Sequence, residues 1–475
     1  MDLFLLSPEI SLTALALVVI VLDLMLPAGS KKVLGVVAAV GLAVPAYFVW
    51  ALWGSTGQSF AGALVVDPLA LFFKGLFLAA AALVILASFE HVDKVRIPAG
   101  EYYALLLAAT AGLMLMVGTR ELISIYVGLE LATISLCLLA AFALGNPKSS
   151  EAGLKYILLN AIASSTLLYG MALLYGLTGS TFLEGIAKGL GAGNVTPTMV
   201  LALGLVVAGL GFKIAAVPFH MWVPDVYEGA PTTITAFLSV ASKAAGFALA
   251  LRVMIVALGP LDSIWPVAFA VIAAVTMTLG NAVAMWQDNV KRMLAYSSIA
   301  QAGYAAMALA AATEDATAGL SFFLLAYTLT NLGAFIAVIA FFNHAGSDKL
   351  SDYAGLARRA PLLALGLTVC LLSLAGIPPM VGFISKVYLF VQVYNAGLVW
   401  LVILGLLNSA ASMYYYMRPI REMYLGTAPA DTLVKVTPAV GVALVAAVVG
   451  VFVVGIFPDP LINAAQEAAV ALFPK

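Results

Sequence analysis

The sequence predicts an all-α, polytopic membrane protein with about 14 transmembrane helices. Three observations predict this fold class. First, 64% of the 475 residues are hydrophobic and only 9% are charged, whereas a soluble protein needs roughly 25% charged residues to cover its surface. Second, the apolar residues form runs long enough to cross a bilayer, which takes roughly 20 residues per helix. Third, Lys and Arg gather in alternate connections between these runs, as in multi-pass membrane proteins.

The composition also excludes several classes of function. A formal net charge of −1 provides no electrostatic basis for nucleic-acid binding. Cys137 and Cys370 lie inside apolar runs, and the three histidines are far apart in the sequence. These residues supply neither a disulfide framework nor a set of haem or iron–sulfur ligands, and the chain has no glycine-rich dinucleotide fingerprint. We therefore expect no cofactor and no metal in this chain.

Fourteen apolar runs define the expected spans. No connection is long enough for a soluble domain, the longest being residues 179–196. The expected spans are 3–26, 33–53, 65–89, 102–119, 121–143, 152–178, 197–221, 229–256, 263–286, 291–312, 317–343, 360–393, 398–424 and 436–457.

The first three spans form an N-terminal segment, residues 1–100. The first span carries Asp2 and Glu9 and lacks a basic start, so we expect a retained helix rather than a cleaved signal peptide. The third span contains Lys74, about seven residues from its outer end. A lysine at this depth can extend its ammonium group to the membrane surface, and we expect Lys74 to do so.

Ionisable residues deep inside later spans are the strongest indication of function. Glu130 lies in the fifth span, Lys213 in the seventh, Lys243 in the eighth and Lys386 in the twelfth. Each such charge costs roughly 2.5–3.5 kcal/mol on insertion, so a lipid-facing scaffold would not retain them. We expect them to face one another or water and to carry protons. A static ion pair between Glu130 and a lysine is the alternative.

The seventh span is predicted to be broken by a proline. Pro218 cannot donate a hydrogen bond to the carbonyl of Ile214, which follows Lys213. In lipid, a broken helix is tolerated only where protein or water satisfies the freed backbone. His220 lies seven residues after Lys213, so on a continuous helix the two would share a face. His220 is interpreted either as a further relay residue or as a hydrogen-bonded core histidine.

The twelfth span shows the same pattern. Pro378 and Pro379 remove two backbone donors and free the carbonyls four residues earlier, at Leu374 and Ala375. Lys386 follows about two turns later. Two interrupted helices, each with a lysine, at corresponding positions in two halves of a chain indicate a transporter built from repeats. Kinks that serve only helix packing are the alternative.

Polar residues inside the eighth to eleventh spans can order a file of water between the lysines. Any one of them alone is more often a hydrogen bond between two helices. They are Thr235, Ser239, Ser242, Asn281, Ser297, Ser298, Gln301, Tyr327, Thr328, Thr330 and Asn331.

The distribution of cations predicts the orientation. Of the 22 Lys and Arg residues, 14 follow odd-numbered spans and four follow even-numbered spans or lie at the C-terminus. Basic connections stay in the cytoplasm. We therefore expect the connections after odd-numbered spans in the cytoplasm and both termini on the opposite, periplasmic side.

Four stretches of the chain resemble a known family. They are SSEAGLKYILLNAIASSTLLYGMALLYGLTGST, KIAAVPFHMWVPDVYEGAPTTITAFLSVASKAAGF, QDNVKRMLAYSSIAQAGY and GIPPMVGFISKVYLF. These stretches are closely similar to the antiporter-like membrane subunits of bacterial proton-pumping NADH-quinone oxidoreductase, respiratory complex I. That family also includes subunits of Mrp cation/proton antiporters. The resemblance is strong over residues 100–425 and weak at the ends of the chain.

The resemblance implies how the spans are grouped. Spans four to eight, residues 101–257, and spans nine to thirteen, residues 258–425, would form two inverted five-helix repeats. Spans seven and twelve would be the broken ones. Residues 426–475 would form the fourteenth span and a tail.

The resemblance also implies the site. The family's proton-path residues correspond to Glu130, Lys213, Lys243 and Lys386, with His220 as an additional relay position. The tenth span has no carboxylate equivalent to that of the fifth, and its nearest polar candidate is Gln301. The second half of the path is therefore not expected to copy the first.

Partners and location follow from the same resemblance. NADH, FMN, iron–sulfur clusters and quinone are expected on partner subunits. The expected partners are the lipid bilayer and other membrane-arm subunits of complex I, including antiporter-like and small membrane subunits, with no nucleic acid. The expected location is the bacterial inner membrane.

The resulting hypothesis is a proton path coupled to quinone reduction elsewhere in the complex. A proton would pass Lys213 to reach Lys243, move along a wet polar axis to Lys386 and leave outward, while Glu130 stabilises protonated Lys213. The main alternative is an Mrp-type cation/proton antiporter subunit that works without NADH. A purely structural membrane subunit and a solute carrier are further alternatives.

Overall fold

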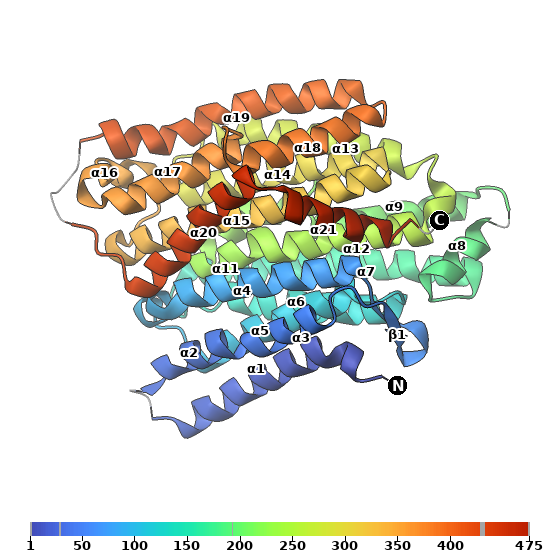
Figure 1. Cartoon of the computed structure of the whole chain (residues 1–475), viewed down its shortest axis with the longest axis horizontal. Helices are drawn as coiled ribbons and strands as arrows, with labels where there is room; N and C mark the ends of the chain where they lie inside the picture. The colour runs from blue at the N-terminus through green and yellow to red at the C-terminus, as the bar shows by residue number, and fades with distance from the viewer. Residues whose placement is uncertain (1, 28–29, 192, 428–432, 474–475) are drawn as a thin grey trace.

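A computed structural model describes residues 2–27, 30–191, 193–427 and 433–473. Long helices lie roughly side by side and form an elongated bundle (Figure 1). The described ends of the chain lie at the same end of the bundle, together with β1 and α8, while α16 lies at the opposite end (Figure 1). This placement agrees with an even number of crossings.

The elements follow one another in a simple order. The helices and strands are α1 (Ser7–Met25), α2 (Lys32–Gly41), α3 (Ala43–Ala51), β1 (Gly57–Ser59), β2 (Leu64–Val66), α4 (Pro68–Val95), α5 (Ala99–Val117), α6 (Leu122–Ala140), α7 (Pro147–Thr178), α8 (Leu183–Gly191), α9 (Pro197–Lys213), α10 (Trp222–Gly229), α11 (Thr232–Phe237), α12 (Lys243–Arg252), α13 (Trp265–Ala284), α14 (Val290–Ala311), α15 (Glu314–Ala345), α16 (Leu356–Arg359), α17 (Pro361–Ala375), α18 (Val381–Asn395), α19 (Val399–Leu425), α20 (Pro438–Ile456) and α21 (Asp459–Val470).

The all-α membrane fold predicted from the sequence is confirmed. Among the described residues, eleven helical segments are long and apolar enough to cross a membrane. The three remaining expected spans correspond to α14 and to the two interrupted pairs α9–α10 and α17–α18. Both predicted breaks are therefore present. The break after α9 covers residues 214–221, and the break after α17 covers residues 376–380.

Several boundaries differ from the prediction. The third span was expected from residue 65, but residues Leu64–Val66 pair as an antiparallel strand with Gly57–Ser59. The helix begins at Pro68 because the Asp67 carboxylate caps it, accepting a hydrogen bond from the Ala70 backbone N–H at 2.8 Å. The seventh span was expected to end at residue 221, but its second half, α10, continues to residue 229.

Two short helices were not expected. The connection 179–196 contains α8, and the predicted C-terminal tail contains α21. After α20, α21 lies across the long helices and packs on α4 and α15. These helices are too short to span a membrane, so hydropathy over a span-length window does not detect them.

The prediction for Lys74 is wrong. Its side chain does not extend to the surface but is completely buried, and its ammonium group lies 2.6 Å from the Glu9 carboxylate on α1. An unpaired lysine charge in the low-dielectric interior would be costly. The Glu9 carboxylate pairs with this charge and so stabilises Lys74 inside the bundle.

Small residues allow two pairs of helices to pack closely at corresponding places in the two halves of the chain. A Cβ atom on Gly112 of α5 would lie 2.6 Å from the backbone nitrogen of Ala132 on α6. A Cβ atom on Gly280 of α13 would lie 2.6 Å from that of Ala300 on α14. Close approach at small residues is how membrane helices associate. The similarity supports the predicted repeats, whose boundaries remain a prediction.

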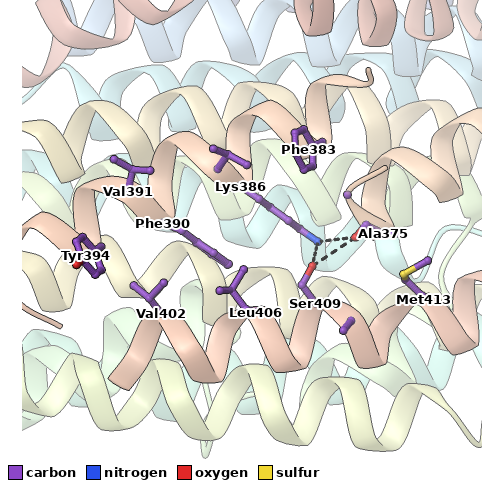
Figure 2. A pocket seen from close by; sticks show the side chains of 13 residues that line it. Ala375, Phe383, Lys386, Phe390, Val391, Tyr394, Val402, Leu406, Ser409 and Met413 are labelled. Atoms are coloured by element: carbon purple, nitrogen blue, oxygen red, sulfur yellow. Dashed lines mark hydrogen bonds between the residues drawn. The ribbon is translucent and has the colours of Figure 1, made fainter. Parts of the chain in front are cut away.

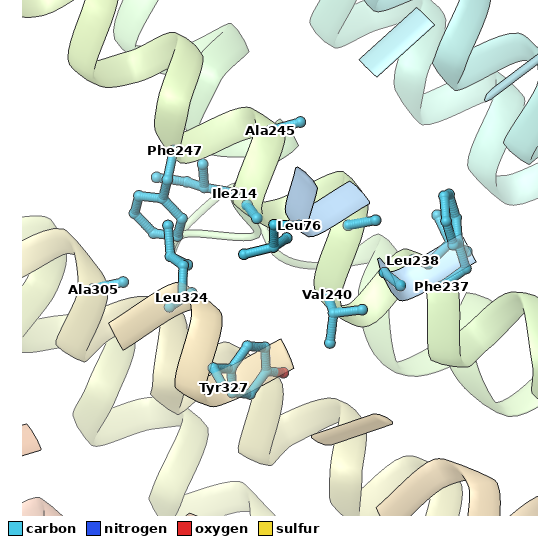
Figure 3. Close-up of a cluster of buried hydrophobic side chains, with 14 of the residues drawn as sticks. Leu76, Ile214, Phe237, Leu238, Val240, Ala245, Phe247, Ala305, Leu324 and Tyr327 are labelled. Atoms are coloured by element: carbon cyan, nitrogen blue, oxygen red, sulfur yellow. The ribbon is translucent and has the colours of Figure 1, made fainter. Parts of the chain in front are cut away.

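The centre of the bundle is formed by α15 and by the segment Thr232–Ala257, each 89% buried over its most apolar window. Leu76, Phe247, Leu324 and Tyr327 belong to a cluster of buried hydrophobic side chains there (Figure 3). Most of the interior is therefore apolar.

Candidate functional site

Lys213 is the last residue of α9 and lies beside the break. Its side chain is 4% exposed, and its ammonium group donates to the Thr133 hydroxyl of α6 at 2.7 Å. Gly246 of α12 faces the lysine stem, since a Cβ atom there would lie 3.0 Å from Lys213 Cγ. The absence of a side chain at this glycine is what lets the buried lysine lie between α6 and α12.

Glu130 lies one turn before Thr133 on α6 but does not touch Lys213. Its carboxylate accepts a hydrogen bond from the Ser164 hydroxyl of α7, which is in turn 2.9 Å from the Tyr126 hydroxyl. In the part of the chain that the structure describes, no ion pair joins Glu130 to a lysine. The expected contact between Glu130 and Lys213 is thus absent from the structure. Glu130 bonds to the Ser164 hydroxyl and Lys213 to the Thr133 hydroxyl instead.

His220 is not on the same helical face as Lys213, because no helix connects them. It lies within the break between α9 and α10, where the spacing rule for a continuous helix does not apply. Its ring is partly buried, and its Nδ1 atom has no hydrogen-bond partner among the described residues. The relay role expected for His220 therefore stays a prediction.

Lys243 lies at a local irregularity of the segment Thr232–Ala257, which we call the central helix. It follows a π-helical turn, Leu238–Ser242, and is 2% exposed. π-bulges of this kind are frequent at functional sites. The Lys243 ammonium donates to the Ser298 hydroxyl of α14 and, at 2.8 Å, to the Ser298 carbonyl.

The hydrogen-bond chain continues beyond Ser298. The Tyr327 hydroxyl of α15 donates to the Ser298 hydroxyl oxygen at 2.8 Å. Both residues belong to the set of polar candidates that the sequence singled out. Through these two residues, the hydrogen bonds of Lys243 extend to α14 and α15 in the second half of the chain.

Lys386 lies beside the second break and points from α18 toward the end of α17 (Figure 2). Its ammonium donates to the carbonyls of Leu374 at 2.8 Å and Ala375 at 3.3 Å, and to the Ser409 hydroxyl of α19 at 3.0 Å. It also lies 5.0 Å from the centre of the Tyr304 ring. The freed carbonyls predicted from the prolines are thus ligands of the buried lysine.

Two cavities adjoin Lys386. One, of about 520 Å³, lies between α18 and α19 and is mostly apolar, with Lys386 and Ser409 as its polar groups (Figure 2). The other lies on the opposite side, is lined by Tyr327, Gln301 and Lys386 among others, and has a volume of about 10 Å³. That is room for about one water molecule.

Gln301, the polar candidate of the tenth span, lines this small cavity together with Tyr327 and Lys386. Its amide donates to the Leu374 carbonyl at 3.2 Å, the same carbonyl that Lys386 contacts. The result is a nearly continuous polar line from Lys243 through Ser298 and Tyr327 to Lys386. Lys213 lies on a separate chain of hydrogen bonds, and among the described residues no hydrogen bond or ion pair joins it to Lys243.

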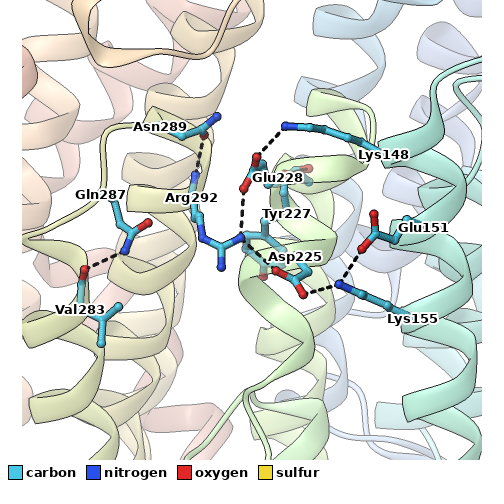
Figure 4. A network of polar contacts seen from close by, with 11 residues as sticks. Lys148, Glu151, Lys155, Asp225, Tyr227, Glu228, Val283, Gln287, Asn289 and Arg292 are labelled. Carbon is cyan, nitrogen blue, oxygen red and sulfur yellow. Dashed lines mark hydrogen bonds and ion pairs between the residues drawn. The ribbon is translucent and has the colours of Figure 1, made fainter.

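A charged network joins the two halves at the basic end of the bundle (Figure 4). The Arg292 guanidinium of α14 lies 2.9 Å from Asp225 and 3.0 Å from Glu228, both on α10. Lys148 and Lys155 of α7 complete it, at 2.9 Å from Glu228 and 2.7 Å from Asp225. This network therefore ties α10, the second half of the broken helix, to both α7 and α14.

A buried ion pair at the other end was missed by sequence reasoning, which counted Arg252 among the four cations that follow even-numbered spans or lie at the C-terminus. Arg252 is fully buried and makes two hydrogen bonds of 2.9 Å to the Asp67 carboxylate. The only sequence signal was a basic residue at the edge of an apolar run, which does not specify a partner 185 residues away.

Across the described residues, no group of three His, Cys, Asp or Glu side chains is arranged to hold a metal ion. The buried groups of the site are instead ammonium groups, hydroxyls, amides and backbone carbonyls. All of these groups form hydrogen bonds, and the ammonium groups and hydroxyls among them can pass protons along such bonds.

Comparison with known proteins identifies relatives over the full length. The family described as "NADH:quinone oxidoreductase/Mrp antiporter, TM" matches residues 119–412. NADH-quinone oxidoreductase subunit N of Moorella thermoacetica is 46% identical over 473 residues, which are 99% of this chain and 99% of that protein.

Solved structures show the same relationship. A chain of respiratory complex I from Thermus thermophilus with bound aureothin superimposes with a TM-score of 0.83 at 35% identity, covering 97% of this chain and 99% of that chain. A chain of the Mrp complex from Dietzia sp. superimposes with a TM-score of 0.85 over 100% of this chain and 98% of that chain, but at 23% identity. The latter likeness is one of fold alone.

Proposed function

This chain belongs to the NADH:quinone oxidoreductase/Mrp antiporter family of membrane proteins, and we propose that protons cross it along the line of polar groups between Lys243 and Lys386. Its function is that of a proton-translocating membrane subunit of NADH-quinone oxidoreductase, like the subunit N proteins to which it is similar. The Mrp-type alternative has only a distant structural relative in its favour.

The single observation that supports this path is the hydrogen-bond chain from Lys243 through Ser298 to Tyr327, which ends at a cavity shared with Lys386. An ammonium group can release a proton to a hydroxyl oxygen while that hydroxyl passes its own proton on. One water in the cavity would connect the Tyr327 hydroxyl to the Lys386 amine.

The hydrogen bonds also suggest a gate. Lys243 and Tyr327 both donate to Ser298, so two donors converge on one oxygen. A proton can move toward Lys386 only after the Ser298 and Tyr327 hydroxyls turn to donate in that direction. This turn is favoured when Lys243 is protonated and Lys386 is neutral, because the positive charge then lies on the Lys243 side.

Charges inside the bundle interact with one another over longer distances than in water, because the low-dielectric interior screens them little. Among the described residues, no carboxylate lies within ion-pair distance of Lys243 or Lys386, so dipoles alone balance their charges. A charge that changes on a neighbouring subunit can therefore shift a proton between them.

The direction of transport follows the charge asymmetry of the chain. We propose uptake at the basic end, which contains α16 and the network around Arg292, and release at the end that holds the termini. This places the basic end in the cytoplasm, both termini in the periplasm and the chain in a bacterial inner membrane.

The redox chemistry is assigned to partners. We propose that NADH, FMN, iron–sulfur clusters and quinone bind other subunits of the complex, and that antiporter-like and small membrane subunits flank this chain within the bilayer. Glu130 and Lys213 bond to different hydroxyls, Ser164 and Thr133, outside the line between Lys243 and Lys386. We propose that a neighbouring charge acts on Lys243 through these two residues. His220 stays a candidate relay residue.

The test is proton pumping by the assembled complex in proteoliposomes. Lys243→Leu should lower the number of protons pumped per electron several-fold, because the line loses its first carrier. Lys435→Ala, an exposed lysine at the basic end, is the matched control and should pump normally. Normal pumping and normal quinone reduction by Lys243→Leu would contradict the proposal.

A further inference from the structure

A buried polar cluster lies at the basic end, where α4, α14 and α15 meet the start of α11. Lys291 of α14 donates to the Ala230 carbonyl at 2.9 Å and lies 3.8 Å from the Asp348 carboxylate. His91 of α4 is hydrogen-bonded through Nδ1 to the Asn343 side-chain oxygen at 2.9 Å. We call His91, Thr232, Lys291, Asn343 and Asp348 the inlet cluster.

Four atoms of the inlet cluster lack a protein partner. They are His91 Nε2, Thr232 Oγ1, Asn343 Nδ2 and Asp348 Oδ1, none of which has a hydrogen-bond partner among the described residues. His91 and Thr232 are each only 1% exposed. A buried polar atom without a partner is unfavourable. Bound water would satisfy all four atoms, since buried water serves otherwise unsatisfied groups.

Hydroxyl groups extend the cluster into the bundle. Ser88 lies one turn before His91 on α4, and its hydroxyl is 2.8 Å from that of Tyr102 on α5. The Tyr102 hydroxyl donates to Thr233 at 2.7 Å, and Thr233 adjoins Thr232 of the cluster. A hydrogen-bonded chain of hydroxyls therefore returns to the start of the central helix.

The central helix carries the line onward to Lys243. Thr235, Ser239 and Lys243 follow one another at intervals of four residues. The Ser239 hydroxyl accepts a hydrogen bond from the Asn331 amide of α15 at 2.7 Å, and the side-chain oxygen of Asn331 is another buried atom without a partner among the described residues. Asn331 lies one turn after Tyr327, the residue between Ser298 and the small cavity beside Lys386.

We propose that the inlet cluster is a hydrated proton-uptake site that delivers protons to Lys243 by a route that does not pass through Lys213. Asp348, with its side chain 13% exposed, accepts a proton from cytoplasmic water, and bound water and hydroxyls carry it past Thr232 and Ser239. Only O–H and N–H bonds form and break. The inference rests on the proposed function, because it supplies the proton that Lys243 passes on.

Hydration is tested by cysteine labelling of the whole complex in inverted membrane vesicles, whose cytoplasmic side faces the medium. Thr232→Cys should react with a small, membrane-impermeant thiosulfonate. Ala337→Cys, equally buried on the apolar part of α15, should not react. Both native cysteines of this chain are buried, so labelling of the unsubstituted chain gives the background signal. Equal and negligible labelling of the two variants would overturn the proposal.

Transport is tested with Asp348→Asn and Thr232→Val in proteoliposomes. Both should lower the protons pumped per electron several-fold, whereas Asp288→Asn, whose side chain is 86% exposed at the same end, should not. Recovery in Asp348→Glu and Thr232→Ser would separate proton uptake from a folding defect.

The failure of this inference can be distinguished from that of the proposed function. If Lys243→Leu lowers pumping but Asp348→Asn and Thr232→Val pump as well as Asp288→Asn, the inlet is wrong and the path beyond Lys243 stands. If Lys243→Leu also pumps normally, the proposed function itself is wrong.

Discussion

The Lys386 ammonium donates a hydrogen bond of 2.8 Å to the carbonyl oxygen of Leu374, across the break between α17 and α18. The last carbonyls of a helix have no partner within it, and they form the negative end of the helix dipole. Lys386 supplies the missing donor and receives a partial counter-charge in return. The carbonyls freed by the break, which would be costly in lipid, thus hold the Lys386 ammonium group.

This relationship predicts how Lys386 variants behave. Lys386→Met should destabilise the subunit by about 1–3 kcal/mol, because buried carbonyls lose their donor, and should also stop pumping. Lys386→Arg should keep much of the stability but pump poorly, because guanidinium does not release its proton. Thermal denaturation and pumping of the same preparations separate the two effects. Full pumping by the arginine variant would show that Lys386 does not exchange protons.

Tyr327→Phe removes one hydroxyl from the line between the two lysines. Pumping should fall several-fold, since the Ser298 hydroxyl then has no route to the one-water cavity. Tyr415→Phe is the control, because Tyr415 is equally buried and donates to Asn281 outside this line. Equal proton-to-electron ratios in the two variants would remove Tyr327 from the path.

Thr133→Val leaves the buried Lys213 ammonium without the hydroxyl it contacts at 2.7 Å. The free energy of unfolding should fall by about 1–3 kcal/mol, while Thr133→Ser should behave like the wild type. Because Lys213 lies on its own hydrogen-bond chain, the variant should slow pumping less than Lys243→Leu does. Measured pumping rates for the three variants check this order.

The Glu9–Lys74 pair should be structural. Glu9→Gln or Lys74→Met alone should destabilise the protein by about 3–5 kcal/mol, because each leaves a buried charge unpaired. The double variant Glu9→Leu/Lys74→Met should recover most of that loss and pump normally. A double variant that folds but does not pump would place this pair on a proton path.

Asp348 should titrate above the usual range of an aspartate. Burial raises the pKa of its carboxyl, and the Lys291 ammonium opposes this only in part. The protonated form should therefore persist above pH 3.8, the ordinary value. Infrared difference spectra between the wild type and Asp348→Asn should show its carboxylic acid band disappearing at a higher pH. Loss of that band at or below the ordinary value would mean that the site is open to bulk water.

The fold class, both breaks and the burial of Lys213, Lys243 and Lys386 could be predicted from the sequence. These properties depend on residues that are close together in the sequence. About 20 apolar residues specify a span, and Pro218, Pro378 and Pro379 remove backbone donors wherever they occur. Lys213, Lys243 and Lys386 were identifiable because a charge inside an apolar run is rare whatever surrounds it.

Which groups contact one another could be seen only in the folded chain. Glu9 holds Lys74 inside, Asp67 pairs with Arg252, and Glu130 binds Ser164 instead of Lys213. Such contacts depend on how each helix is rotated and how closely it approaches its neighbours. Close packing at small residues of distant helices controls both, and no pattern within a single span records it.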